Sequence, residues 1–172
     1  MSVIYFIFQQ TMLFTIPLMI VALGGMFSER SGVVNIALEG IMIMGAFTGV
    51  FFLNLTGGRM SGQLQLLIAI VISMATGAVF SLTHAYAAIN MKADQTISGT
   101  ALNMFAPAFA IFVARVIQGV QQVQFTNTFR INSVPVLGKI PFIGPLLFQN
   151  TYITTYIGIA ILLISTLVLY KP

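Results

Sequence analysis

The sequence contains no cysteine and no tryptophan, and it has few charged residues. Its 172 residues include seven Lys or Arg, three Asp or Glu and one His. The absence of cysteine excludes disulfides, iron–sulfur clusters and thiol catalysis. So few carboxylates and imidazoles argue against a metal site or a catalytic centre. We therefore expect no metal, no cofactor and no enzymatic activity.

The remaining composition is that of a membrane protein. Hydrophobic residues make up 58% of the chain and charged residues 6%, whereas charged residues form about a quarter of a typical soluble domain. The formal net charge is +4, but the basic residues are scattered singly and form no patch that could follow a phosphate backbone. We expect contact with anionic membrane lipid and no binding of nucleic acid.

Five apolar segments have about the 20 residues that a helix needs to cross a bilayer core of roughly 30 Å. They are residues 3–27, 33–55, 64–88, 97–119 and 152–170. The first lacks the basic start of a cleavable signal peptide, so we expect it to be retained. The sequence predicts an all-α, polytopic membrane protein with about five transmembrane helices in a single domain over residues 1–172.

Between the last two segments, residues 120–150 are rich in Asn, Gln and Thr and are interrupted by Pro and Gly. We expect an ordered extramembrane loop with a short interfacial stretch at residues 136–148. Basic residues are divided equally between the two sides, three on each. Because the positive-inside bias acts mainly through short loops, the long loop is discounted. This places the N-terminus outside, the C-terminus in the cytoplasm and the loop in the extracellular space.

In that orientation, four charged residues in the two short connections form a polar cluster on the cytoplasmic side. They are Glu29, Arg30, Lys92 and Asp94. The cytoplasmic side carries Arg30, Lys92 and Lys171, and the opposite side carries Arg59, Arg130 and Lys139.

Polar residues within the apolar segments need partners, because lipid offers none. Ser31, Asn35 and Glu39 are spaced at i, i+4 and i+8. On a helix over residues 33–55 they would form one stripe, with Glu39 about two turns into the apolar region. Two interpretations are open: the stripe lines a translocation pathway, or it is a hydrogen-bonded joint between helices. Asn103 is a further pathway candidate, because Pro107 one turn later predicts an irregular helix there.

Small residues recur at helical spacing on two of the segments. Close backbone approach between membrane helices requires such residues, so we expect these positions to pack helices together. They are Gly45, Gly49, Ser73, Gly77 and Ser81.

The one histidine, His84, allows two interpretations. It could relay protons, or it could be a structural residue. The segment over residues 64–88 has no second titratable group to receive a proton, so we favour the structural role.

Two blocks of the sequence resemble a known family. Residues 22–40 read ALGGMFSERSGVVNIALEG, and residues 93–103 read ADQTISGTALN. These blocks are similar to the permease subunits of bacterial ABC importers, in the class that serves ribose and other simple sugars, branched-chain amino acids and nucleosides. The first block looks most like the nucleoside and simple-sugar branch. The resemblance covers this chain but only about the first half of a typical member, so we expect an N-terminal half.

The resemblance implies a subunit of the bacterial inner membrane that imports a nucleoside or simple sugar by alternating access. Its partners would be cytoplasmic ABC ATPase subunits, a second permease subunit, and a substrate-binding lipoprotein or periplasmic receptor. The sequence has no Gly-rich phosphate loop ending in Gly-Lys-Ser/Thr, so ATP hydrolysis would belong to the ATPase. The pathway candidates are Asn35, Glu39 and Asn103.

Two other function classes stay open from the residues alone. One is an ion-coupled carrier or a proton-conducting membrane subunit, which needs titratable residues at mid-depth on facing helices. The other is a structural membrane assembly factor, which would tolerate loss of the block over residues 28–40.

Overall fold

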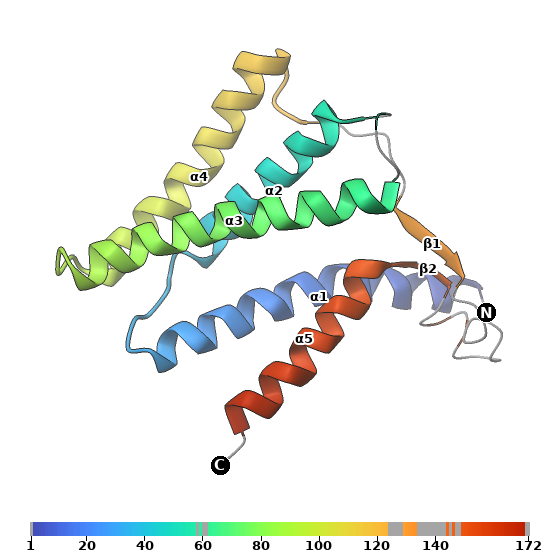
Figure 1. Ribbon diagram of the computed structural model, residues 1–172, viewed down its shortest axis with the longest axis horizontal. Coiled ribbons are helices and arrows are strands. Elements are labelled where there is room, and N and C mark those ends of the chain that lie inside the picture. The colour runs from blue at the N-terminus through green and yellow to red at the C-terminus, as the bar shows by residue number, and fades with distance from the viewer. Residues whose placement is uncertain are drawn as a thin grey trace. The chain divides into compact units, whose positions relative to one another are not determined.

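The structure is a computed structural model that describes residues 2–57, 59, 62–123, 129–133, 144, 146 and 149–170. These residues are mostly helical, with five helices and one two-stranded sheet (Figure 1). The helices are α1 (Ser2–Arg30), α2 (Leu38–Leu55), α3 (Gly62–Ile89), α4 (Gln95–Gln118) and α5 (Ile153–Tyr170). Lys139, Lys171 and most of the stretch predicted as interfacial, 136–148, lie outside the described residues.

Four of the described helices, α1 to α4, are long and apolar enough to cross a membrane, and α5 is a shorter apolar helix. Large apolar side chains point outward along these helices: Phe14 is 68% exposed and Met104 is 72% exposed. Exposure of that size on a predicted span is expected where lipid is the solvent. That α5 also crosses the membrane stays a prediction.

The chain divides into two compact units. One consists of Met1–Gly24 with Phe129–Pro172, and the other is Gly25–Thr128. Helix α1 contributes its first residues to one unit and its last residues to the other.

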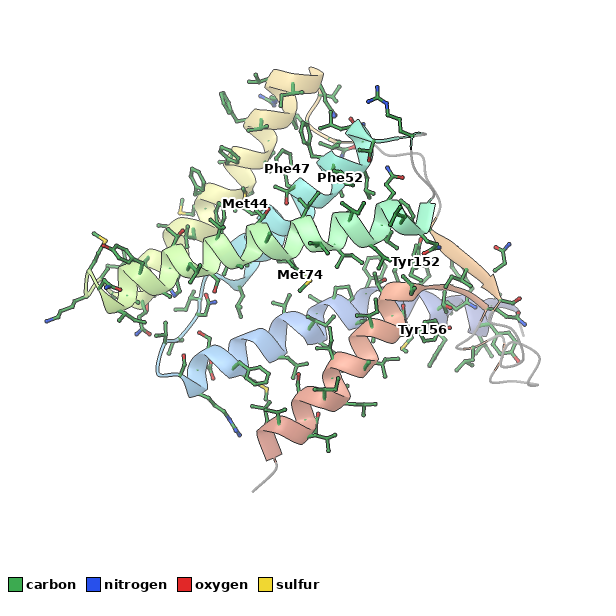
Figure 2. All side chains as sticks on the ribbon, viewed as in Figure 1. Met44, Phe47, Phe52, Met74, Tyr152 and Tyr156 are labelled. Atoms are coloured by element: carbon green, nitrogen blue, oxygen red, sulfur yellow. The ribbon has the colours of Figure 1, made fainter. Side chains whose placement is uncertain are left out.

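In the unit Gly25–Thr128, α2 packs against both α3 and α4. Its contact with α3 depends on small residues: a Cβ atom at Gly45 would lie 3.1 Å from the Ser73 carbonyl oxygen, and one at Gly49 would overlap the Ser73 hydroxyl. Such spacing allows the two backbones to approach closely. Figure 2 labels Met44 on α2, which is 4% exposed.

Other polar and small residues lie along the same α2–α3 contact. The Thr48 hydroxyl donates to the Thr76 hydroxyl at 3.1 Å. A Cβ at Gly77 would meet Ile41 at 3.5 Å, which is ordinary contact, and Ser81 is half-buried further along α3.

The other unit contains the sheet, which the all-α prediction missed. Strand β1 (Arg130–Ser133) pairs antiparallel with β2 (Gln149–Tyr152), with Arg130 opposite Tyr152. Strand β1 lies in the stretch predicted as an ordered extramembrane loop, 120–150, and β2 begins there and continues to Tyr152. Their backbone groups pair with each other across the two strands, which satisfies them without a helix.

Side chains attach this sheet to the helices of its own unit. The Gln9 amide of α1 donates to the Gln149 carbonyl at 3.1 Å. The hydroxyls of Thr151 and Tyr156 lie 2.8 Å apart, which connects β2 to the first turn of α5, where Figure 2 labels Tyr156. In addition, Gly158 of α5 packs directly on Ile16 of α1.

Candidate functional site

After α1 the chain forms a turn whose side chains hydrogen-bond to the backbone of the same turn. The Ser28 hydroxyl donates to the Val33 carbonyl at 2.7 Å, and the Ser31 hydroxyl donates to the Ser28 carbonyl at 2.6 Å. Gly32 has φ +88°, in the left-handed region that favours glycine. The polar connection between the first two spans is therefore an ordered turn.

The next five residues, 33–37, are not helical, and we call them the entry segment. The predicted polar stripe is therefore wrong: Ser31 and Asn35 precede α2, and Glu39 is only its second residue. The physical reason is local, because the Asn35 side-chain oxygen accepts a hydrogen bond from the Ala37 nitrogen at 3.1 Å. Short polar side chains of this kind compete with the helix for backbone groups.

Side chains from α4 bind the backbone of the entry segment. The Val34 nitrogen donates to the Gln95 side-chain oxygen at 2.8 Å. The Asn103 amide donates to the Ile36 carbonyl at 2.8 Å, and its oxygen accepts from the Gly40 nitrogen at 2.7 Å. Non-helical backbone next to a membrane span requires such partners, since lipid supplies none.

His84 of α3 holds the entry segment from another direction. Its side chain is 2% exposed. Its Nε2 lies 3.4 Å from the Val34 carbonyl oxygen, and its Nδ1 lies 3.0 Å from the Ser98 hydroxyl. The neutral tautomer with the proton on Nε2 satisfies both contacts, donating to Val34 and accepting from Ser98. The geometry gives His84 a structural role.

Two glycines allow α4 to lie directly against this region. A Cβ at Gly99 would lie 2.9 Å from Ile36 Cβ, and one at Gly40 would lie 2.7 Å from the Leu102 carbonyl oxygen. Real Cβ atoms do not approach other atoms that closely, so a side chain at Gly99 would push α4 away from the entry segment, and one at Gly40 would push α2 and α4 apart.

The structure brings together two of the three pathway candidates and leaves the third exposed. Asn35 and Asn103 both bind backbone at the start of α2. Glu39 is exposed in the first turn of α2, where the helix dipole favours a carboxylate.

The charged residues of the predicted cytoplasmic cluster have different local settings. The Asp94 carboxylate caps α4 by accepting from the nitrogens of Thr96 at 2.8 Å and Ile97 at 3.0 Å. Lys92 lies in the turn between α3 and α4 with φ +51°. Glu29 and Arg30 form the end of α1.

Among the residues that carry hydrogen bonds in this unit, sequence reasoning missed Gln95, Ser98 and Gln65. The first two lie inside the block 93–103, and the resemblance of that block to the permease family was a signal for them. Gln65 is fully buried on α3 and donates to the Leu53 carbonyl at 3.0 Å and the Thr56 hydroxyl at 2.8 Å. It thus provides a partner for a carbonyl group at the C-terminal end of α2. In the sequence it was marked only as a polar residue in an apolar run.

Comparison with known families identifies the chain. The profile described as "Branched-chain amino acid transport system / permease component" matches residues 7–171. The chain belongs to this permease family. It is accordingly a multi-pass membrane permease, as the four long apolar helices among its described residues indicate.

Several curated proteins are similar to this permease chain. The "Guanosine ABC transporter permease protein NupQ" of Bacillus subtilis is 44% identical over 99% of this chain and 53% of its own length. The "Nucleoside ABC transporter permease protein NupC" of Lactococcus lactis is 38% identical over 93% of this chain and 50% of its own length. A "Putative glucose ABC transporter permease protein TsgC13" of Haloferax volcanii is 28% identical over 90% of this chain and 44% of its own length.

The permease chain spans about half the length of these relatives. No solved structure matches it significantly.

Proposed function

We propose that this permease chain forms part of the translocation pathway of an ATP-driven importer for nucleosides. The observation that carries the proposal is its similarity, across nearly its whole length, to two permeases whose names specify guanosine and nucleosides. The composition is compatible with this solute class. A neutral nucleoside needs no compensating charge in the membrane, and the chain has only three carboxylates.

The proposed topology has five spans including α5, with the N-terminus outside and the C-terminus in the cytoplasm of the bacterial inner membrane. Successive spans alternate in direction, so the end of α1 and the turn between α3 and α4 lie on one side. These connections carry Arg30 and Lys92, which supports a cytoplasmic location for them. The entry segment then lies near the cytoplasmic face, beside the cluster of Glu29, Arg30, Lys92 and Asp94.

This location suggests how the chain would respond to its partners. Cytoplasmic ATPase subunits would drive alternating access in this chain and a second permease subunit, and an external receptor would deliver the solute. The entry segment is non-helical and is held by one side chain of α3 and two of α4, so a small displacement of either helix changes its hydrogen bonds. Asn35, Glu39 and Asn103 would line or support the pathway at this point.

Uptake measurements test the proposal. Cells with and without the gene are given tritiated guanosine, adenosine or ribose, and a strain with an inactive partner ATPase is the control. We expect nucleoside uptake to require both the gene and the active ATPase. Uptake of ribose alone would reassign the solute to sugars, and no difference for any solute would refute the proposal.

The same cells discriminate the rival classes. Uptake that survives ATPase inactivation but stops with a proton uncoupler would indicate an ion-coupled carrier. Normal uptake after replacement of both Asn35 and Glu39 would remove these residues from the pathway.

A further inference from the structure

An open cavity lined by amides lies where α2 and α4 end. Its volume is about 510 Å³, within the range of about 300–1,000 Å³ typical of small-molecule sites. Both helices run toward it from the region of the entry segment and end at the upper side of Figure 1. Its lining residues are Asn54, Gln118, Val120, Gln121 and Gln122.

Hydrogen bonds set the positions of these amides. The Gln118 amide donates to the Asn54 side-chain oxygen at 2.8 Å, which connects α4 to α2. Gly119 ends α4 with φ +73° and donates to the Arg115 carbonyl, so the chain turns there and residues 120–122 reach the same cavity. With its amide turned so that oxygen and nitrogen each face a suitable partner, Gln121 accepts from Arg115 through Nε at 3.2 Å and through Nη2.

An apolar cavity adjoins the amide-lined one. It has a volume of about 300 Å³, shares Gln121, and continues between α2 and α4. Phe47 and Val50 line it from α2, and Ala110 and Ala114 line it from α4. Phe47, labelled in Figure 2, offers an aromatic ring on which a planar base could stack.

We propose that this amide-lined cavity is a binding site for a neutral solute of the nucleoside class. An amide side chain carries N–H donors and an acceptor oxygen, the kinds of group that pair with the base edges and hydroxyls of a nucleoside. None of the five lining residues carries a charge, and Arg115, which hydrogen-bonds to Gln121, is not one of them. An apolar solute would displace water from these amides without replacing its hydrogen bonds, and a phosphorylated or zwitterionic solute would find no compensating charge in the lining.

The proposal rests on the proposed function and adds a location to it. In the proposed orientation the cavity opens to the outside, where an external receptor releases its solute. It would therefore be the first site that the solute occupies on the permease.

Binding and uptake are measured in parallel to test the site. Membranes containing the assembled importer, from a strain without the receptor, are incubated without ATP with tritiated guanosine and, separately, with photoreactive 8-azidoguanosine. Two variants change the cavity in different ways: Gln122→Leu removes an amide, and Val120→Trp fills space. Gln63→Leu, near the start of α3 and outside the cavity lining, is the matched control.

We expect each cavity variant to weaken guanosine binding about tenfold, since about 1.4 kcal/mol of lost hydrogen bonding or contact has that effect. Binding per chain, normalised by immunoblot, should be unchanged in the control. The photolabel should map to peptides at the ends of α2 and α4, and guanosine monophosphate and leucine should compete poorly.

The failures are distinguishable. One result is that the wild type imports nucleosides while both cavity variants bind guanosine as tightly as the wild type, and another is that it does so while the photolabel maps elsewhere. Either result overturns the site and leaves the importer function standing. Strong competition by the monophosphate overturns the neutral solute class. Absence of nucleoside uptake in the wild type overturns the proposed function itself.

Discussion

The side-chain oxygen of Asn103 on α4 lies 2.7 Å from the backbone nitrogen of Gly40 on α2, although the two residues are 63 positions apart. The first nitrogens of a helix have no partner within the helix and are usually satisfied by the residue just before it. Here the N-cap position is Ala37, whose side chain cannot accept a hydrogen bond. Helix α2 therefore starts in a position that depends on α4.

Replacing Asn103 tests this dependence. Asn103→Leu leaves the Gly40 nitrogen and the Ile36 carbonyl without their side-chain partner, so we expect a loss of about 1–3 kcal/mol of stability. Thermal unfolding of the purified importer in lipid nanodiscs measures it. Asn90→Leu, at an exposed asparagine after α3, is the matched control. Equal unfolding temperatures for the two variants would contradict the capping role.

The close approach of α2 and α4 is tested by adding one methyl group. Gly40→Ala places a Cβ against the Leu102 backbone, which cannot move without shifting α4, so we expect destabilisation by about 1–3 kcal/mol. At Gly24 of α1, no described atom outside the local helix lies within 4 Å of the added Cβ. Gly24→Ala should instead stabilise the helix by about 0.5–1 kcal/mol. Opposite shifts in unfolding temperature are the expected result, and shifts of the same sign would count against the contact.

His84 provides a third test, because its substitutions separate hydrogen bonding from size. His84→Leu removes both of its polar contacts and leaves the Val34 carbonyl with one partner fewer, which should cost about 1–3 kcal/mol. His84→Gln keeps a donor and should retain more of the stability. The control is Thr83→Val on the exposed side of α3. If His84→Gln unfolds as readily as His84→Leu, the contact to Val34 contributes little.

Glu39 distinguishes a pathway role from a structural one. Because its side chain is exposed at the start of α2, Glu39→Gln should change the unfolding temperature little. If Glu39 lines the pathway, guanosine uptake should still fall about tenfold, a change of about 1.4 kcal/mol in the barrier. Uptake and chain abundance are measured together in the same membranes. Unchanged uptake at normal abundance would exclude Glu39 from the pathway.

Much of this fold was predictable from hydrophobicity alone. The predicted segments 3–27, 64–88 and 97–119 correspond to α1, α3 and α4 within a few residues. Uninterrupted apolar runs leave a helix as the main way to satisfy backbone groups in lipid, so the sequence indicates these elements directly. The segment 33–55 was wrong at its start, because Val33 to Ala37 are apolar enough to continue the helix but are bonded elsewhere.

The sequence by itself determined that the chain is a helical membrane protein with few charges, and its two blocks pointed to the permease family. Only the tertiary structure decided where α2 begins, which side chains hold the entry segment and that β1 pairs with β2. Composition and periodicity describe each segment in isolation, whereas Gln95, His84 and Asn103 act on backbone atoms at least 50 residues away. Such partners are selected by the packing of α2 against α3 and α4, which no local pattern records.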